Sequence, residues 1–154
     1  MNPHDAAPMV IAGCSRRKTA TASPVPALDL YQGGCIPALR ARAASQPGLR
    51  ARTWIISAEY GLLNADALVL PYDRRLDPSR ALAVRSQVDH RLQAECQRHG
   101  TPRAVLVIAE PVYQLALTGL PRIVGHDRVH WINDPATGWA GAEAVLDHWS
   151  QSCP

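Results

Sequence analysis

The residues best suited to chemistry occur in three short polar clusters, each of which directly follows an apolar run. The first, GCSRRKT at 13–19, joins small residues to three cations, and the second, SAEYGLL at 57–63, joins a serine, a carboxylate and a tyrosine. The third is Glu110, which opens the segment EPVY at 110–113. Because ligands bind beyond the carboxyl ends of parallel strands, we expect one site where these clusters meet.

The first cluster has the composition of an anion-binding loop. Backbone amides together with Ser15 and Lys18 could hold a phosphate or a carboxylate. The loop is not a Walker loop, because the glycine that should precede the lysine is absent, and Ala20 stands where a phosphatase loop would have arginine. Cys14, close to three cations, could act as a nucleophile. The simpler interpretation is a small buried residue at the end of a strand.

The second cluster could position a carboxylate beside a flat ring. Glu59 could polarise a water molecule or stabilise a positive charge, while Tyr60 and Tyr72 could stack on a base. In the alternative interpretation, Glu59 caps the following turn and both tyrosines fill the rim of the sheet. All the tyrosines of the chain lie in or beside the clusters, which favours a ring-binding site over core packing: Tyr31, Tyr60, Tyr72 and Tyr113.

Composition and charge narrow the class of protein. The 154 residues are 47% hydrophobic and 19% charged, which excludes a disordered chain and predicts one packed domain over 1–154. No apolar run is long enough for a membrane span and the start lacks the order of a signal peptide, so we expect a cytoplasmic protein with no membrane partner. The net charge of +3 is compatible with a polyanionic partner.

Metal and disulfide chemistry are not indicated. The four cysteines show no CxxC pair, and no histidine pair has the spacing of metal ligands, so we expect neither a metal nor another cofactor. Among 16 cationic residues Lys18 is the single lysine. In a chain that otherwise uses arginine, a single lysine favours a binding role for that residue, because lysine and arginine are not interchangeable at a binding site.

The elements that must position these clusters alternate between strand and helix. Continuous apolar runs predict strands, buried on both faces, at 9–12, 54–56 and 104–109, with a weak fourth strand between Arg122 and Ile132. Helices are predicted at 37–46, at 78–99 with Asp77 as N-cap, from Pro111, and near Gly138. The order predicts an α/β fold: a three-layer Rossmann-like sandwich around a mostly parallel central sheet of about four to five strands.

Several of these stretches together resemble the DUF6884 family and, more remotely, are similar to the YaaA (DUF328) peroxide-stress proteins. The stretches that carry the resemblance are GCSRRK at 13–18, PALDLYQG at 26–33, SAEYGLL at 57–63, PYDRRL at 71–76 and VIAEPVYQLAL at 107–117. The family-like core covers about 9–118 and leaves a tryptophan-containing helical extension at 119–154. One departure is Glu110, where we expect the family to have glycine, so the site has either an added carboxylate or an altered loop.

The resemblance implies a link to nucleic acids or modified bases, and for YaaA to DNA binding and oxidative stress. The leading hypothesis is therefore an N-glycosidase or DNA glycosylase that acts on a modified or damaged base. We expect a catalytic group of Glu59 or Asp73 with Ser57. The residues expected to bind substrate are Cys14, Ser15, Lys18, Asp29, Tyr31, Tyr60, Gly61, Tyr72, Glu110 and Tyr113.

Two alternatives remain open at this stage. In the first, the protein is a non-catalytic DNA-binding or stress-protection protein; in the second, it is an enzyme centred on Cys14. The partner is expected to be nucleic acid, with DNA favoured over RNA, or a free nucleotide, and the protein a monomer or homodimer. A set of arginines could follow a phosphate backbone or could be plain solvated surface: Arg40, Arg42, Arg50, Arg52, Arg74, Arg75 and Arg80.

Overall fold

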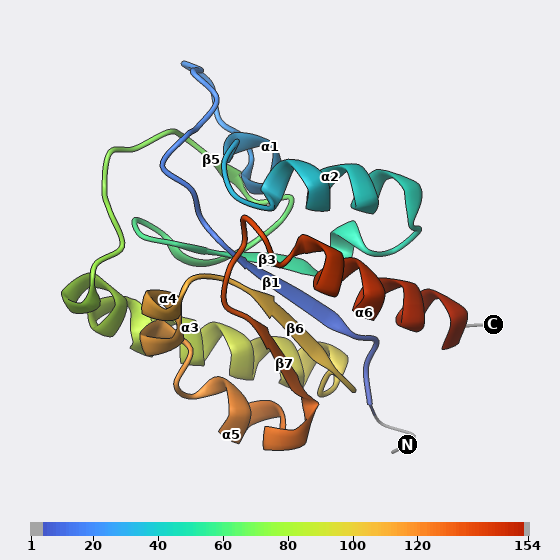
Figure 1. Cartoon of the computed structure of the whole chain (residues 1–154). Helices are drawn as coiled ribbons and strands as arrows, with labels where there is room; N and C mark the ends of the chain where they lie inside the picture. Colours follow the sequence, from blue (N-terminus) through green and yellow to red (C-terminus); the bar gives the residue numbers. More distant parts are fainter. Residues whose placement is uncertain (1–4, 153–154) are drawn as a thin grey trace.

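A five-stranded sheet organises the computed structural model, which describes residues 5–152 (Figure 1). The strand order is β4-β3-β1-β6-β7, and every neighbouring pair is parallel except β3 with β4. The strands are β1 (Met9–Gly13), β3 (Thr53–Ser57), β4 (Gly61–Asn64), β6 (Val105–Ile108) and β7 (Val129–Ile132). A separate two-stranded sheet pairs β2 (Val25–Pro26) with β5 (Leu68–Val69).

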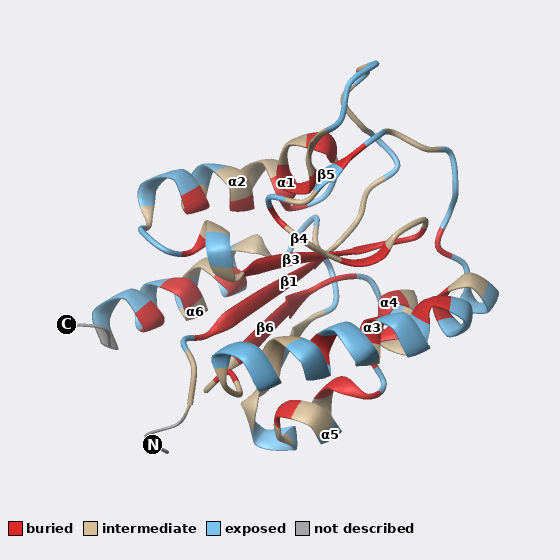
Figure 2. Cartoon of the chain, turned by 180° about the vertical axis from the view of Figure 1, so that it is seen from behind, coloured by how far each residue is buried: buried red, intermediate tan, exposed pale blue. Residues whose placement is uncertain are grey.

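Helices cover both faces of the sheet, which confirms the expected three-layer α/β sandwich (Figures 1 and 2). One layer consists of α1 (Ala27–Leu30), α2 (Ile36–Ser45) and α6 (Trp139–Ser152). The other consists of α3 (Pro78–His99), α4 (Pro111–Ala116) and α5 (Leu120–Val124). Two short 3₁₀ turns, η1 (Arg50–Arg52) and η2 (His126–Arg128), lead into β3 and β7.

Alternate residues of each central strand enter opposite core layers. In β1, Ile11 packs in the α3 layer, whereas Val10 and Ala12 pack in the α2 and α6 layer, and all three are fully buried. This is why the strand reads as a continuous apolar run rather than an alternating one. Figure 2 shows the result as buried strands between helices that expose only their outer faces.

Helix α3 follows its sequence signals closely. It spans 78–99 as predicted, and the Asp77 side chain accepts the Arg80 amide at 2.7 Å, as expected of an N-cap. The helix ends at Gly100, whose φ of 89° lies outside the range that other residues readily adopt. Its buried stripe is Ala81, Val84, Val88 and Leu92.

Several elements differ from the sequence-based expectation. Strand β4 and the short helix α1 were not predicted; β4 turns back on β3 through Gly61, which has a φ of 76°. The predicted strand between 122 and 132 is confirmed only at its end, because Leu120–Val124 forms helix α5. The segment after 118 is not purely helical, because β7 adds a strand to the central sheet and α6 packs on that sheet.

The connectivity makes β1 the point at which the chain changes direction across the sheet. The connection from β1 to β3 runs through α1 and α2 on one face, whereas α3 leads back past β1 to β6 on the opposite face. Ligands of open α/β sheets bind beside such a strand, at the carboxyl edge. Among residues 5–152, no helix combines the length and hydropathy needed to cross a bilayer.

Candidate functional site

The carboxyl ends of β1 and β3 meet at a chain of hydroxyl groups. Ser57, the last residue of β3, donates a hydrogen bond to the Tyr72 hydroxyl at 2.9 Å, and that hydroxyl lies 2.9 Å from the hydroxyl of Tyr31. Ser57 Oγ also accepts the backbone amides of Glu59 and Tyr60, at 3.2 and 3.0 Å. The single Ser57 proton is therefore committed to Tyr72. These bonds make Ser57 position the turn after β3, and its expected catalytic role stays a prediction.

Burial keeps the tyrosines of this edge neutral. The pKa values of Tyr31, Tyr72 and Tyr113 are all raised, first by loss of hydration, and for Tyr72 and Tyr113 next by the neighbouring Cys14. Tyr31 has no exposed surface at all, and Tyr113 is 8% exposed. The expectation that the tyrosine distribution reflects ring binding rather than core packing is therefore wrong for Tyr31 and Tyr113, whose rings are core residues.

Cys14 and Tyr113 are in direct contact at the end of β1. Tyr113 donates its hydroxyl proton to the Cys14 carbonyl at 2.7 Å, and its oxygen lies 3.3 Å from Cys14 Sγ. These contacts tie the start of the loop to α4. Gly13 makes this arrangement possible, because a Cβ there would stand 2.9 Å from the Tyr113 ring.

Backbone bonds among residues 5–152 hold the loop after β1 at 14, 17 and 19, since the Arg17 carbonyl accepts the Gln32 amide at 2.9 Å, but they leave the amides of 15–18 unused. The amides of Cys14 and Thr19 bond to the carbonyls of Ile56 and Leu30, at 2.9 and 2.7 Å, whereas within the described residues no backbone carbonyl accepts the amides of 15–18. The Ser15 hydroxyl accepts the Gly33 amide at 3.0 Å and donates to the Arg17 carbonyl at 2.8 Å. Ser15 was expected to bind phosphate; its bonds make it a shaping residue of the loop instead.

Lys18 lies where the open loop meets the tyrosines. Its ammonium stands 4.3 Å from the centre of the Tyr72 ring and 5.9 Å from that of Tyr31, and donates to the Arg16 carbonyl at 3.3 Å. Within 5–152 it forms no ion pair. A cation on an aromatic face without a carboxylate partner keeps its charge available to an incoming anion.

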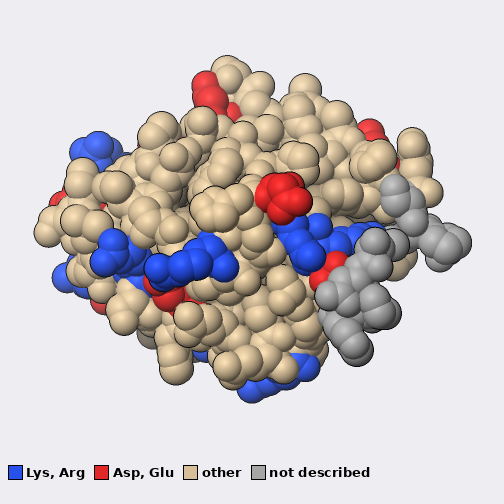
Figure 3. Space-filling view, turned by 90° about the horizontal axis from the view of Figure 1, so that it is seen from below, with Lys and Arg blue, Asp and Glu red and all other residues tan. Residues whose placement is uncertain are grey.

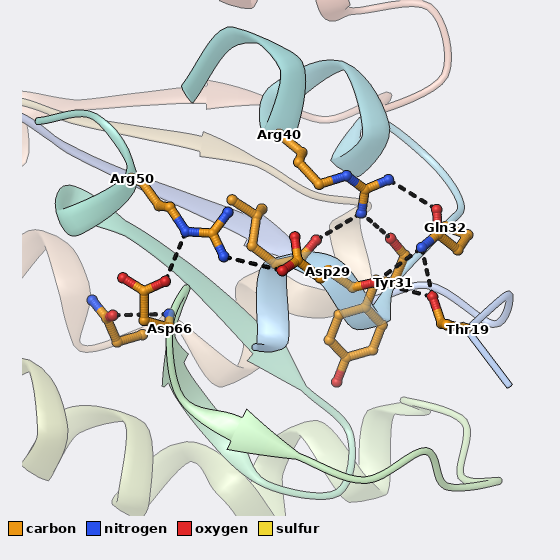
Figure 4. A network of polar contacts seen from close by, with 9 residues as sticks. Thr19, Asp29, Tyr31, Gln32, Arg40, Arg50 and Asp66 are labelled. Atoms are coloured by element: carbon orange, nitrogen blue, oxygen red, sulfur yellow. Dashed lines mark hydrogen bonds and ion pairs between the residues drawn. The ribbon is translucent and has the colours of Figure 1, made fainter. Parts of the chain in front are cut away.

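A network of polar contacts fixes this loop against α1 and α2 (Figure 4). Gln32 donates to Thr19 Oγ1 at 2.7 Å, and Arg40 donates to Gln32 and to the carbonyls of Leu28 and Tyr31. Gln32 and Thr19 were not among the expected site residues, since amide and hydroxyl groups at such positions carry no distinctive spacing.

Asp29 belongs to the same network of polar contacts. Arg50 bridges Asp29 and Asp66, at 3.3 and 2.7 Å (Figure 4). Asp29 was expected to bind substrate. Its ion pair with Arg50 joins α1 to η1, and its role in binding substrate stays a prediction.

Glu59 and Tyr60 lie on the turn between β3 and β4. The Glu59 carboxylate lies 3.6 Å from Arg74, and Arg80 donates to the carbonyls of Ala58 and Glu59, at 2.6 and 3.0 Å. Among the residues that the structure describes, no backbone amide donates to the Glu59 carboxylate, so its side chain does not cap the turn. The Tyr60 ring meets the Tyr72 ring edge-on at 5.4 Å, and its hydroxyl donates to the Leu70 carbonyl at 3.0 Å.

The remaining predicted residues lie at the margin of the site. Glu110 is exposed at the start of α4 and makes no capping hydrogen bond, while Asp73 is exposed in the irregular segment that leads to α3. Gly61 contributes backbone shape rather than a ligand group, because its positive φ forms the turn between β3 and β4.

Most of the arginines that could follow a phosphate backbone form bonds to other groups of this chain. Arg40, Arg50 and Arg80 make the bonds given above, and Arg42 pairs with Asp147 at 2.7 Å, so most of these guanidinium groups are occupied. On the face shown in Figure 3, Lys and Arg form separate groups with Asp and Glu among them. The interpretation of this set as a track for a phosphate backbone stays a prediction.

Two open hollows lie at the opposite, amino edge of the sheet. One, of about 450 Å³, is bordered by Asp5, Arg128 and Trp149; the other, of about 370 Å³, by Trp54 and Arg91. Their cations already have partners, since Arg128 pairs with Asp5 at 3.0 Å and Arg91 lies 5.7 Å from the Trp54 ring centre. We therefore place the candidate site at the carboxyl edge. No group of side chains within 5–152 has the arrangement of a metal site.

Comparison with known proteins gives one match. A family model described as "Family of unknown function (DUF6884)" matches residues 9–131, which is most of the chain and extends beyond the expected limit of 118. No curated protein and no solved structure matches. The chain belongs to this family.

Proposed function

We propose that this DUF6884 family member is a hydrolase of the N-glycosidic bond, acting on a nucleotide or on a modified or damaged base in nucleic acid. The observation that carries the proposal is Lys18, which lies on the Tyr72 ring in a loop with open amides and has no ion pair within the described residues. A phosphate bound there would place its sugar and base toward the end of β3, where Glu59 and Tyr60 follow.

The loop supplies the phosphate-binding part of the proposal. The amides of 15–18 and the Lys18 ammonium offer several donors over a few residues, which suits the oxygens of one phosphate. Arg16 and Arg17 are exposed on the same loop and add positive charge. The role that we expected of Ser15 passes to these backbone amides, because the hydroxyl is already bonded.

Of the two candidate carboxylates, Glu59 has the better support. Its backbone is held by Ser57 and Arg80, and its carboxylate lies beside Arg74, whereas Asp73 is exposed in a segment without regular structure. A carboxylate on a fixed turn can hold a water molecule in one position. Tyr60, half-buried next to Tyr72, offers the ring contact to the base that the enclosed Tyr31 cannot offer.

In the proposed reaction, the bond between the anomeric carbon and the base nitrogen breaks, and its electron pair leaves with the base. The oxygen of a water molecule bonds to the anomeric carbon, while Glu59 accepts a proton from that water and stabilises the positive charge that develops on the sugar. The base takes up a proton from solvent. Neutral Tyr72 and Tyr31 stay protonated throughout and hold the geometry of the edge.

Base release tests the proposal. Purified protein is incubated with oligonucleotides that carry normal, oxidised and hypermodified bases, with free nucleotides and with tRNA, and liberated base is detected by mass spectrometry. We expect Glu59→Gln to lower release by about 10²- to 10⁴-fold, the usual contribution of a general base. The matched control is Glu95→Gln, on α3, whose carboxylate faces His99 at 3.9 Å and which should keep full activity.

Other outcomes separate the alternatives. No release from any substrate, with DNA still bound in a salt-dependent way, would favour a non-catalytic DNA-binding protein. Release abolished by Cys14→Ser but retained by Glu59→Gln would favour a Cys14 nucleophile. The remote similarity to YaaA, with its link to DNA and peroxide stress, and a cytoplasmic location are further parts of the proposal.

A further inference from the structure

The positive charge at the carboxyl edge is concentrated in one short loop. Arg16, Arg17 and Lys18 are consecutive, and none of them forms an ion pair within the described residues. The nearby arginines on α2, η1 and α3 donate to carbonyls or carboxylates of the chain itself. A protein gains affinity for a nucleic-acid strand from each phosphate along it that Lys or Arg neutralises. Three adjacent cations instead match a single phosphate group.

Carboxylates border this cationic loop. Glu59 follows β3, Glu110 follows β6 and Asp73 lies in the segment that carries Tyr72, and both Glu110 and Asp73 are exposed. Glu59 pairs with Arg74, but Glu110 and Asp73 form no ion pair within the described residues, so a phosphodiester chain that continued toward either of them would bring its next phosphates toward negative charge. Like charges brought together without a partner weaken binding. A ligand with one terminal phosphate avoids this repulsion.

The space for rings is also limited. Tyr31 is fully buried, whereas Tyr72 and Tyr60 are both half-buried; the Lys18 ammonium covers one face of Tyr72, which leaves Tyr60 as the half-buried ring with no cation of the described residues over it. Two exposed apolar side chains, Leu68 and Leu70, lie on the segment to which the Tyr60 hydroxyl bonds. One ring and a small apolar border suit one base rather than a stacked series.

We propose that the ligand of this site is a free nucleoside monophosphate, recognised by its terminal phosphate, and not a base within a DNA or RNA strand. This inference rests on the proposed function and specifies the form of its substrate. The phosphate binds the amides of 15–18 and Lys18, and the base lies against Tyr60 beside Leu70.

Equilibrium binding tests this inference separately from catalysis. Calorimetry is carried out on the full chain with each 2′-deoxynucleoside 5′-monophosphate, with the matching nucleoside, and with single- and double-stranded 12-mers of the same bases. We expect the monophosphate to bind at least tenfold more tightly than both the nucleoside and the 12-mer. Lys18→Met, which keeps an aliphatic chain over Tyr72, should remove the tenfold advantage of the phosphate. Arg85→Ala, an exposed cation on α3, should not.

The outcomes distinguish the two proposals. If a 12-mer binds as tightly as the monophosphate, with an affinity that falls steeply with salt, the inference is overturned, while base release from that strand would leave the glycosidase proposal standing. If the monophosphate binds as expected but no base is released, the ligand class holds and the reaction does not. If neither ligand binds, both proposals fail.

Discussion

Neighbouring cations near the candidate site differ in whether the chain itself supplies acceptors for their charge. Arg40 and Arg50 lie within a closed network, where each guanidinium donates to at least two acceptors of the chain. Lys18, on the loop that this network supports, forms no ion pair within 5–152 and lies on an aromatic ring. The difference teaches that a basic residue indicates a ligand only when the fold leaves it without acceptors. Three mutational tests address this contrast.

The largest effect should follow removal of Arg40. Arg40→Ala deletes the donors to the Leu28 and Tyr31 carbonyls and to Gln32, and leaves half-buried acceptors without partners. We expect the free energy of unfolding to fall by about 3 kcal/mol, measured by urea denaturation. Loss of ligand binding without loss of stability would show instead that Arg40 acts on the ligand.

The second test measures how stability depends on pH through Cys35, which lies between the Lys18 loop and Arg40 along the chain. Cys35 is 3% exposed, and burial raises the pKa of its thiol from 9.0 to about 11. A raised pKa in the folded state adds stability that is fully present below pH 9 and is lost as pH rises through about 11. The two-unit shift corresponds to about 3 kcal/mol.

Urea unfolding between pH 7 and 11 measures this contribution. The wild-type protein should lose more stability above pH 9 than Cys35→Ala, whose alanine cannot ionise. The tyrosines with raised pKa values remain in both proteins, so their effect cancels in the difference. Identical pH profiles would show that the Cys35 thiol is not protected from solvent.

The smallest effect on stability should come from Lys18. Lys18→Met removes one cation from the Tyr72 ring, a contact worth about 1 kcal/mol at a partly exposed site. Thermal unfolding should change accordingly little, while the affinity for a phosphate-bearing ligand falls at least tenfold. A stability loss as large as that of Arg40→Ala would make Lys18 part of the structural network and would remove the contrast between the two groups.

Much of the fold could be predicted because its signals are local. The runs that form β1, β3 and β6 are continuous and apolar, and α3 carries a cap, a proline and a terminal glycine at the expected positions. Strand β4 gave no such signal: GLLN at 61–64 is short, and its pairing with β3 depends on the positive φ of Gly61. Such pairings depend on tertiary contacts that a local pattern does not contain.

The position of the candidate site could be predicted from the sequence, but the roles of its individual residues could not. Strand ends gather at one edge of a parallel sheet, so the clusters after β1, β3 and β6 could be brought together in advance. The hydrogen-bond and ion-pair partners of Ser15, Asp29 and Tyr31 could not be predicted. They come from Gly33, from η1 and from Tyr72, which are distant in the sequence. A hydroxyl or carboxylate has the same sequence signature whether it meets a ligand or its own chain.

Strand β1 also bears on how the protein avoids misfolding. Because both its faces are apolar, polarity cannot tell the correct strand register from one shifted by a single residue. Side-chain volume does distinguish the two registers. A shift by one residue would move Ile11 into the space of Ala12. It would also bring a Cβ to the position of Gly13, 2.9 Å from the Tyr113 ring. Overpacking of this kind costs about 1–3 kcal/mol. The small residues at the end of β1 thus act as a steric check on sheet assembly.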